Sequence, residues 1–328
     1  MAAQMYMEMG DDIKMPSIGY GTFLCNDEQE LETALNAALE VGYRHVDTAL
    51  FYANEHIVGK VVKEWIDAEK LTREDIFITT KLPIFGVHED LVEEFIVKSL
   101  ENLGLDYIDL YLIHFPVHMN YDEGLDNPKF LKTDHIAVWK KMEEQVDEGR
   151  TKTIGLSNFN IEQVDRIVQD ARIKPSCLQI ENHIYLQQRE LVKYCQDNGI
   201  VVVGYSTLGS PGYNSFYASI GKPTRDLPNL FQDPIVVILA EKYEKTAAQI
   251  LLRFQLQRDI VVIPKSVNLT RIEENFNIFD FSINEEDMSK LEALDVGEAA
   301  RIVDFGALSP KLLEQPEWPW PTFNKASE

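Results

Sequence analysis

The sequence of 328 residues is poor in cysteine and has no long apolar run. Its three cysteines, Cys25, Cys177 and Cys195, form no CxxC pair, and an odd number argues against a disulfide framework. No apolar run approaches the roughly 20 residues of a membrane-spanning helix, and the N-terminal residues lack the basic and apolar regions of a secretory signal. We therefore expect a cytoplasmic protein with reduced cysteines and no membrane partner.

Positive charge is also scarce. Lysine and arginine total 31 against 54 aspartates and glutamates, which leaves a formal net charge of −23. Such a surface repels phosphate backbones, so we expect no nucleic-acid partner. If the protein binds an anionic small molecule, its positive charge must be concentrated locally.

Short apolar runs rich in β-forming residues recur along the chain and alternate with amphipathic helical patterns, as in Gln29–Val41 and Asp90–Leu103. Several runs are apolar at nearly every position, which is typical of parallel strands buried on both faces. Eight such units predict an α/β fold, a closed (β/α)8 TIM barrel that spans residues 1–328 as one domain. A doubly wound sheet is the alternative, but no GxGxxG follows the first strand. The predicted strands are Tyr43–Thr48, Ile76–Leu82, Tyr107–His114, Thr153–Ser157, Cys177–Glu181, Ile200–Tyr205, Ile260–Pro264 and Ile278–Ile283.

Four segments depart from this rhythm. Met5–Thr22, with a turn at Gly10–Asp12, predicts an N-terminal β-hairpin that plugs one mouth of the barrel. Phe115–Lys132 and Leu208–Asp233 follow predicted strands, and Val296–Glu328 forms a C-terminal tail. Long segments of this kind on a compact barrel are usually functional, and barrel enzymes place their sites at the C-terminal ends of the strands. We expect them to act as substrate loops.

Polar side chains stand at or just after the ends of the first three predicted strands. They are Asp47, Tyr52, Lys81 and His114. Each alone would more often be a structural residue, but in a barrel these ends converge on one mouth. A phenol has a pKa of about 10, and a neighbouring ammonium lowers it and favours proton transfer. The set therefore predicts a site where Tyr52, assisted by Lys81 and Asp47, protonates an alkoxide while His114 orients the carbonyl oxygen.

The same residues lie in segments that resemble the signatures of the aldo-keto reductase superfamily. The resemblance runs from about Met15 to Phe281, and its motifs are specific. It implies a carbonyl reductase that uses NADP(H) and acts as a monomer on a small-molecule carbonyl. The matching segments are Gly42–Glu55 (GYRHVDTALFYANE), Ile108–Pro116 (IDLYLIHFP), Gly155–Phe159 (GLSNF) and Ile263–Val267 (IPKSV).

The resemblance also implies cofactor contacts at matching positions. Ser157, Asn158 and Gln179 would bind the nicotinamide carboxamide, Tyr205 would stack on the ring, and Thr22 would lie near the ribose. The loop over the pyrophosphate would contain Ser206, Leu208 and Ser210. The remaining contacts, to the 2′-phosphate and the adenine, would come from Lys265, Ser266, Arg271, Glu274 and Asn275.

Two cations beside a helix start suit a dianionic phosphate, which favours NADPH over NADH. Asn268 is placed to cap that helix, with Lys265 before it and Arg271 in its first turn. The alternative is that Arg271 pairs with Glu274 across one helical turn.

The expected acyl pocket differs from that of many relatives, because Phe23, Pro83 and Phe115 stand where they have tryptophans. Apolar linings suit aldehydes, aromatic ketones or steroid-like ketones better than sugars. The tail also resembles that of insect members that reduce 3-dehydroecdysteroids, which suggests a role in steroid metabolism. By position, the predicted pocket residues are Phe23, Phe51, Phe115, Ile302, Phe305 and Leu308.

Other functions remain open at this stage. An aldose or polyol reductase would share the catalytic set, a Schiff-base aldolase could use Lys81, and a non-catalytic NADPH-binding protein could retain the barrel. His114 and His118 are four residues apart, but Pro116 between them prevents a regular helix, so we expect no metal.

Overall fold

The computed structural model describes residues 5–10, 12–122, 124, 127–222, 224–304, 306 and 309–320. Within these ranges the parallel strands form one eight-stranded sheet. The strands, in spatial and chain order, are β3 (Tyr20–Gly21), β4 (His45–Asp47), β5 (Phe77–Leu82), β6 (Ile108–Ile113), β7 (Thr151–Ser157), β8 (Cys177–Glu181), β9 (Val201–Tyr205) and β10 (Ile260–Val262).

The sheet closes on itself through the segment that contains β3. Ile18 forms a parallel bridge with Val262, and the Gly19 amide donates to the Val262 carbonyl at 2.8 Å. On its other side, β3 pairs with β4. The predicted closed barrel is therefore confirmed.

The predicted strand at Ile278–Ile283 is wrong, because β3 occupies the place in the barrel that this run was expected to fill. Side chains, and not a neighbouring strand, form the hydrogen bonds to the backbone of this run. Arg253 donates to the Ile278 carbonyl at 3.0 Å, and Gln257 both donates to and accepts from the backbone of Ile283, at 2.8 and 2.7 Å. The apolar side chains of the run pack against helices rather than between neighbouring strands.

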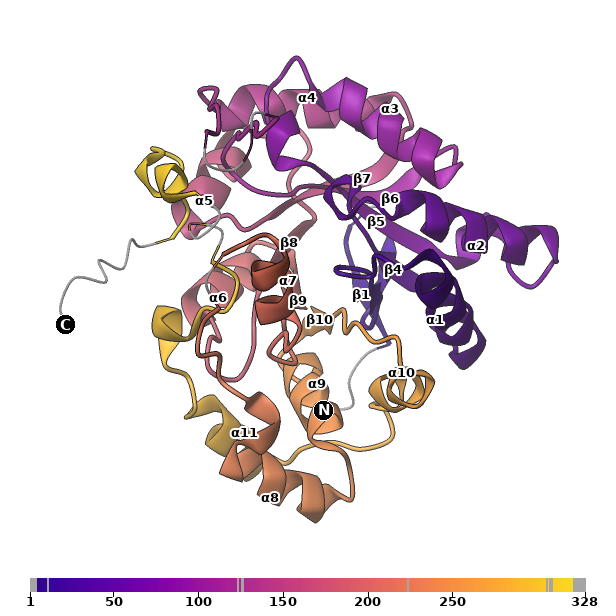
Figure 1. Cartoon of the computed structure of the whole chain (residues 1–328), viewed down its shortest axis with the longest axis vertical. Coiled ribbons are helices and arrows are strands. Elements are labelled where there is room, and N and C mark those ends of the chain that lie inside the picture. The colour runs from indigo at the N-terminus through magenta and orange to yellow at the C-terminus, as the bar shows by residue number, and fades with distance from the viewer. Residues whose placement is uncertain are drawn as a thin grey trace.

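Helices surround the strands (Figure 1). Side chains cap the starts of several of these helices: Asn160 and Gln163 form a reciprocal capping box, and Asn284 accepts from the Asp287 amide. The helices are α1 (Glu28–Val41), α2 (Glu55–Asp67), α3 (Val92–Leu103), α4 (His135–Asp147), α5 (Ile161–Asp170), α6 (Arg189–Asp197), α7 (Tyr213–Ser219), α8 (Pro234–Tyr243), α9 (Ala247–Leu256), α10 (Leu269–Phe276) and α11 (Glu285–Glu292).

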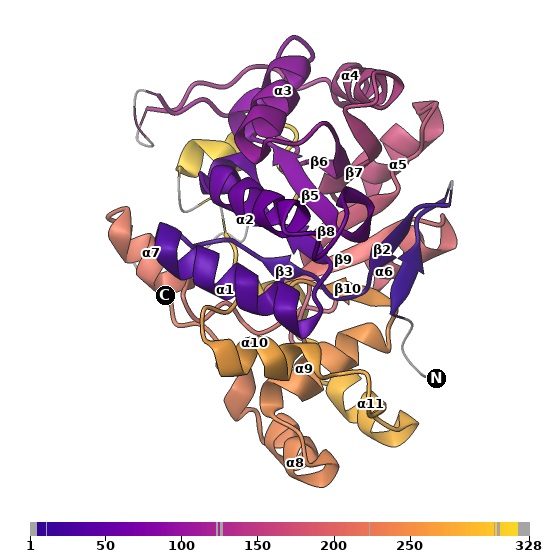
Figure 2. The same cartoon turned by 90° about the vertical axis from the view of Figure 1, so that its right-hand side faces the viewer.

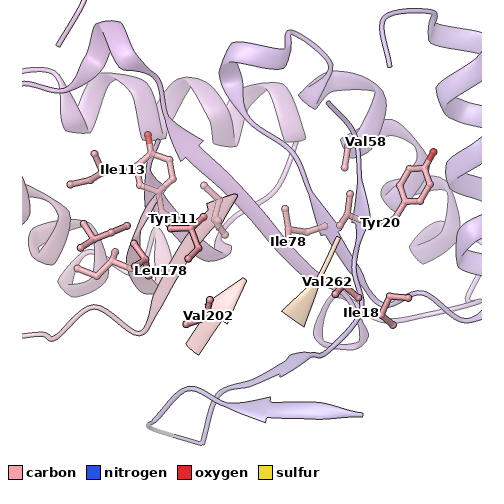
Figure 3. Close-up of a cluster of buried hydrophobic side chains, with 14 of the residues drawn as sticks. Ile18, Tyr20, Val58, Ile78, Tyr111, Ile113, Leu178, Val202 and Val262 are labelled. Atoms are coloured by element: carbon pink, nitrogen blue, oxygen red, sulfur yellow. The ribbon is translucent and has the colours of Figure 1, made fainter. Parts of the chain in front are cut away.

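Alternation along the strands divides the buried side chains between two layers. On β9, Val202 packs outward into the cluster shared with the helices, whereas Val201 and Val203 belong to a cluster inside the barrel. On β10, Val262 lies in the outer layer and Val261 in the inner one. Figure 3 shows part of the outer layer, including Val202 and Val262. Residues two apart on a strand therefore reach the same layer.

The predicted N-terminal hairpin is formed by β1 (Tyr6–Glu8) and β2 (Lys14–Pro16), which pair antiparallel. Its Met9 and Met15 belong to the same cluster as the inner side chains of the strands. The hairpin and α7 lie at opposite ends of the barrel (Figure 2). The hairpin thus closes the mouth opposite to the one that carries α7.

Candidate active site

Side chains alternate between the two faces of each strand, and the inner series end in polar side chains at the mouth opposite the hairpin. On β5 the inner series runs from Phe77 through Thr79 to Lys81, and on β8 it runs from Cys177 to Gln179. Asp47 ends β4, and His114 directly follows β6. The strands therefore bring together the catalytic residues that the sequence predicts.

The centre of this group is a buried ion pair. Lys81 Nζ lies 2.6 Å from Asp47 Oδ1 and donates to the Thr48 carbonyl at 2.8 Å. The same ammonium lies 3.4 Å from the Tyr52 hydroxyl. The rings of Tyr52 and His114 pack edge to face, with their centroids 5.7 Å apart. All four predicted catalytic side chains are thus in one connected cluster.

The pKa of Tyr52 does not fall below its ordinary value, because burial outweighs the lowering expected from the Lys81 ammonium. Burial raises the pKa of Tyr52 well above its ordinary value, and the negative charge of Asp47 adds to this effect. The ammonium of Lys81 is already engaged by Asp47 and by the Thr48 carbonyl. The phenol is therefore held in its protonated form.

His114, in contrast, is held in its deprotonated and neutral form. Burial lowers its pKa well below the ordinary value, and the positive charge of Lys81 contributes in the same direction. Burial also lowers the pKa of Lys81, although Asp47 opposes this effect. The site thus combines a protonated phenol with a neutral imidazole, which can donate one hydrogen bond.

Asn54 fixes the turn that presents Tyr52. Its side-chain amide donates to the carbonyls of Thr22 and Cys25, at 2.9 and 3.2 Å, and its oxygen accepts from the Thr48 hydroxyl at 2.8 Å. Tyr52 ends a single 3-10 turn two residues before Asn54. A short segment is thereby tied to two strand ends, and this limits where the phenol can move.

A cavity of about 590 Å³ opens beside this group. Asp47, Tyr52 and His114 line it, whereas Lys81 is fully buried behind them. Every residue for which the sequence resemblance implied a cofactor contact also lines the cavity: Thr22, Ser157, Asn158, Gln179, Tyr205, Ser206, Leu208, Ser210, Lys265, Ser266, Arg271, Glu274 and Asn275.

The amide side chains near the catalytic group are oriented by their neighbours. Gln179 donates to Asp47 Oδ2 at 2.6 Å, so this carboxylate joins Lys81 to Gln179. Asn158 accepts from the Tyr205 hydroxyl at 2.6 Å and donates to the His114 carbonyl at 2.9 Å. This end of the cavity therefore presents amide groups and an aromatic ring.

The far end of the cavity meets the start of α10. Asn268 accepts from the Arg271 amide at 3.0 Å, which confirms the predicted cap. Within the described ranges, the structure gives neither Lys265 nor Arg271 a salt bridge, so the alternative pairing of Arg271 with Glu274 is not formed. Two cations thus stand beside a helix N-terminus in a strongly acidic chain, an arrangement suited to an anion.

The predicted substrate residues divide into three groups. Phe23 and Phe51 line the cavity. Phe115 does not line it: its ring is buried against Trp318 and Trp320, whose ring centroids lie 5.5 and 5.4 Å away. Ile302 is fully buried against Tyr213 and Tyr217, and its neighbour Val303 lines the cavity instead. Phe305 and Leu308 lie outside the described residues.

Sequence reasoning missed the aromatic side chains of α7. Tyr213 lines the cavity, and the ring of Phe216 lies 5.8 Å from that of Phe23. The signal was present, because Tyr213, Phe216 and Tyr217 have helical spacing inside one of the long segments.

Neither a metal centre nor a membrane-spanning helix is present among the described residues. They hold no group of three or more histidine, cysteine or acidic side chains placed to bind a metal. Among their helices, none is both long and apolar enough to cross a membrane.

Taken with the closed parallel barrel, the buried lysine–aspartate pair beside a protonated phenol defines a barrel enzyme equipped for proton transfer at its open mouth. The model of the aldo/keto reductase family matches residues 17–296, and the chain belongs to this family of oxidoreductases.

Curated relatives support this assignment over most of the chain. Aldo-keto reductase family 1 member A1 of Xenopus tropicalis is 46% identical over 289 residues, 86% of each protein. Aldo-keto reductase family 1 member C15 of Rattus norvegicus is 39% identical over 88% of this chain and 90% of its own length.

Solved structures also support the assignment to this family. An aldose reductase from Schistosoma japonicum matches over 100% of both chains, with a TM-score of 0.84 and 36% identity. A crystal structure of an aldo-keto reductase in complex with NADPH matches 99% of this chain and 97% of its own, with a TM-score of 0.86 and 36% identity.

Proposed function

We propose that this protein uses NADPH to reduce hydrophobic aldehydes or ketones to alcohols, with Tyr52 as the general acid. The observation that carries this proposal is the position of Tyr52, whose hydroxyl lies 3.4 Å from the buried Lys81 ammonium and whose side chain lines the cavity beside His114. The crystallised relative that contains NADPH has 36% identity over nearly the whole chain and supports the choice of cofactor.

The residues along the cavity fit a dinucleotide with a 2′-phosphate. Lys265 and Arg271 would hold the phosphate at the start of α10, and Asn158 and Gln179 would hold the carboxamide near the catalytic group. When bound, NADPH supplies the hydride that reduces the carbonyl carbon.

The chain's own groups then manage the proton. Tyr52 Oη donates its proton to the carbonyl oxygen as negative charge develops there. Lys81, held by Asp47, stabilises the phenolate left behind. His114, kept neutral by burial, donates a hydrogen bond that orients the carbonyl oxygen.

The preferred substrate follows from the walls of the cavity near Tyr52. Phe23, Phe51 and Val303 line this part, and Phe216 supports Phe23 from behind. We propose aromatic or steroid-like carbonyls, including 3-dehydroecdysteroids, in preference to the sugars that an aldose or polyol reductase would take.

The Schiff-base alternative has no support in the geometry. Lys81 is fully buried, does not line the cavity and is engaged with Asp47 and the Thr48 carbonyl. A nucleophilic lysine must instead present a neutral amine to its substrate.

The test is NADPH oxidation, followed by absorbance, with aromatic aldehydes, steroid ketones and aldoses supplied separately. We expect turnover with the first two classes and little with aldoses. Preferred turnover of aldoses would contradict the substrate assignment. Tight NADPH binding without turnover of any carbonyl would favour a non-catalytic binding protein.

We further propose that the chain works as one domain and as a monomer in the cytoplasm. Its three cysteines are all free and buried, which fits a reducing compartment. Sedimentation of the purified protein at micromolar concentration tests the monomer, and a dimer would refute it.

A further inference from the structure

Glu181 is a fully buried carboxylate at the end of β8, two residues beyond Gln179 in the inner series of that strand. Its two oxygens accept from consecutive backbone amides of the C-terminal tail, Ile302 at 2.7 Å and Val303 at 2.8 Å. A carboxylate that receives two backbone N–H groups forms charge-assisted hydrogen bonds, which are stronger than neutral ones. The rim of the barrel therefore binds the tail through the tail's backbone amides.

The same stretch of tail is gripped from its carbonyl side by the long segment after β9. Arg225 donates to the carbonyls of Arg301 and Ile302, both at 2.9 Å. Tyr217, on α7, donates to the carbonyl of Asp304 at 2.5 Å. Residues 301–304 thus lie between two partners that come from separate parts of the chain.

Charges around Glu181 keep it ionised. Burial alone would raise its pKa, but hydrogen bonding to His183 and the charge of Arg301 hold the pKa below its ordinary value. His183 Nε2 lies 3.0 Å from the carboxylate, and the Arg301 guanidinium lies 4.0 Å away and stacks on the Trp320 ring at 4.2 Å. The carboxylate that binds the tail amides therefore has a polar contact with His183 on one side and a nearby positive charge, that of Arg301, on the other.

This grip decides which tail side chain meets the substrate cavity. The amides of residues 302 and 303 both donate to Glu181, and this fixes the backbone from which their side chains leave in different directions. Ile302 is fully buried against Tyr213 and Tyr217, and Val303 lines the cavity. A shift of one residue would place Ile302 or Asp304 in the wall instead of Val303.

We propose that Glu181 and Arg225 are positioning residues that clamp residues 301–304 as a fixed wall of the substrate cavity and tie this wall to the segment that carries α7. The clamp is a property of the chain itself. Its effect on substrate choice rests on the function proposed above.

Hydrogen exchange of the amides of Ile302 and Val303 tests the clamp without any substrate. Glu181→Gln keeps the size of the side chain but removes its charge and one acceptor, so exchange in a peptide spanning 300–306 should accelerate roughly tenfold or more. Glu143→Gln is the matched control, because Glu143 is also buried and accepts a backbone amide, that of Ile173 at 2.8 Å. The control should accelerate exchange near residue 173 and leave 300–306 as slow as in the wild type.

Arg225→Met provides a second variant in case Glu181→Gln folds poorly. It should also accelerate exchange at 302 and 303, because two tail carbonyls lose their donor. Arg44→Met is its control, since Arg44 likewise donates to two backbone carbonyls, those of Leu39 and Tyr43. Exchange as slow as in the wild type in the folded variants would overturn the clamp.

Kinetics tests the consequence for substrate choice. In both variants the KM of a bulky aromatic ketone should change at least about fivefold, while kcat for a short aliphatic aldehyde stays within about twofold. An unchanged KM together with faster exchange would remove the clamp from specificity. If the wild type turned over no carbonyl, the proposed function would fail, and the exchange data would still decide the clamp.

Discussion

Removing the hydroxyl of Tyr52 should abolish most carbonyl reduction while leaving the cofactor site intact. Tyr52→Phe keeps the ring, whose centroid lies 5.1 Å from that of Phe23 and 5.7 Å from that of His114, so packing should hold. The nearby groups are poor replacements as proton donors. Lys81 is engaged by Asp47 and the Thr48 carbonyl, and the low pKa of His114 keeps it neutral.

General acid catalysis is worth roughly 10²–10⁴ in rate, which corresponds to about 3–5 kcal/mol of barrier. With no ready substitute donor, we expect kcat to fall by about 10³ or more. The assay is NADPH oxidation with an aromatic aldehyde, alongside NADPH binding by fluorescence, which should stay within about twofold. Tyr194→Phe is the matched control, because it removes a hydroxyl that donates to Asp165, between helices α6 and α5 and away from the cavity. Retention of more than about a tenth of the wild-type kcat by Tyr52→Phe would refute the assignment.

Three further predictions concern the phosphate grip, pH and helix packing. Replacing Lys265 and Arg271 together by methionine should weaken NADPH binding by roughly a hundredfold and NADH binding by only a few-fold; equal weakening in titrations of both cofactors would contradict the phosphate assignment. Burial lowers the pKa of His45 to about 4, so protonation increasingly favours the unfolded chain as pH falls from 6.5 towards 4. The free energy of unfolding should fall by on the order of 3 kcal/mol over that window because of this group. In His45→Asn, urea unfolding should show a pH dependence smaller by a comparable amount; an unchanged pH dependence would show that His45 is not its cause. Gly59→Ala should destabilise the fold by about 1–3 kcal/mol, because the new Cβ would lie 2.0 Å from the Leu103 carbonyl oxygen; an unchanged urea midpoint would show that α2 and α3 can separate without cost.

Much of the barrel could be predicted because its strands are buried on both faces and therefore stand out as apolar runs. The error at Ile278–Ile283 has a physical cause. This run is as apolar as a strand, but its backbone is satisfied by Arg253 and Gln257. The true closing strand, Tyr20–Gly21, is two residues long and is defined by distant partners, which no local pattern reveals.

The catalytic group was predictable for a related reason, since strand alternation and the C-terminal ends of parallel strands determine where such side chains meet. The substrate wall was not. Whether Ile302 or Val303 faces the cavity depends on the hydrogen bonds of Glu181. The burial of Phe115 depends on tryptophans about two hundred positions away in the chain. The raised pKa of Tyr52 likewise follows from burial, which spacing does not report.

Closure of the barrel by β3 has a consequence for how the chain is made. The Tyr20 hydroxyl donates to the Ser266 carbonyl, a contact between residues 246 positions apart, and Ile18 pairs with Val262. During synthesis the ribosome must therefore deliver more than three quarters of the chain before the two edges of the sheet can join. Until then both edges expose unpaired N–H and C=O groups, which are templates for aggregation. Contacts of such high sequence separation also slow folding, so we expect the nascent chain to depend most on chaperones in the interval before the barrel closes.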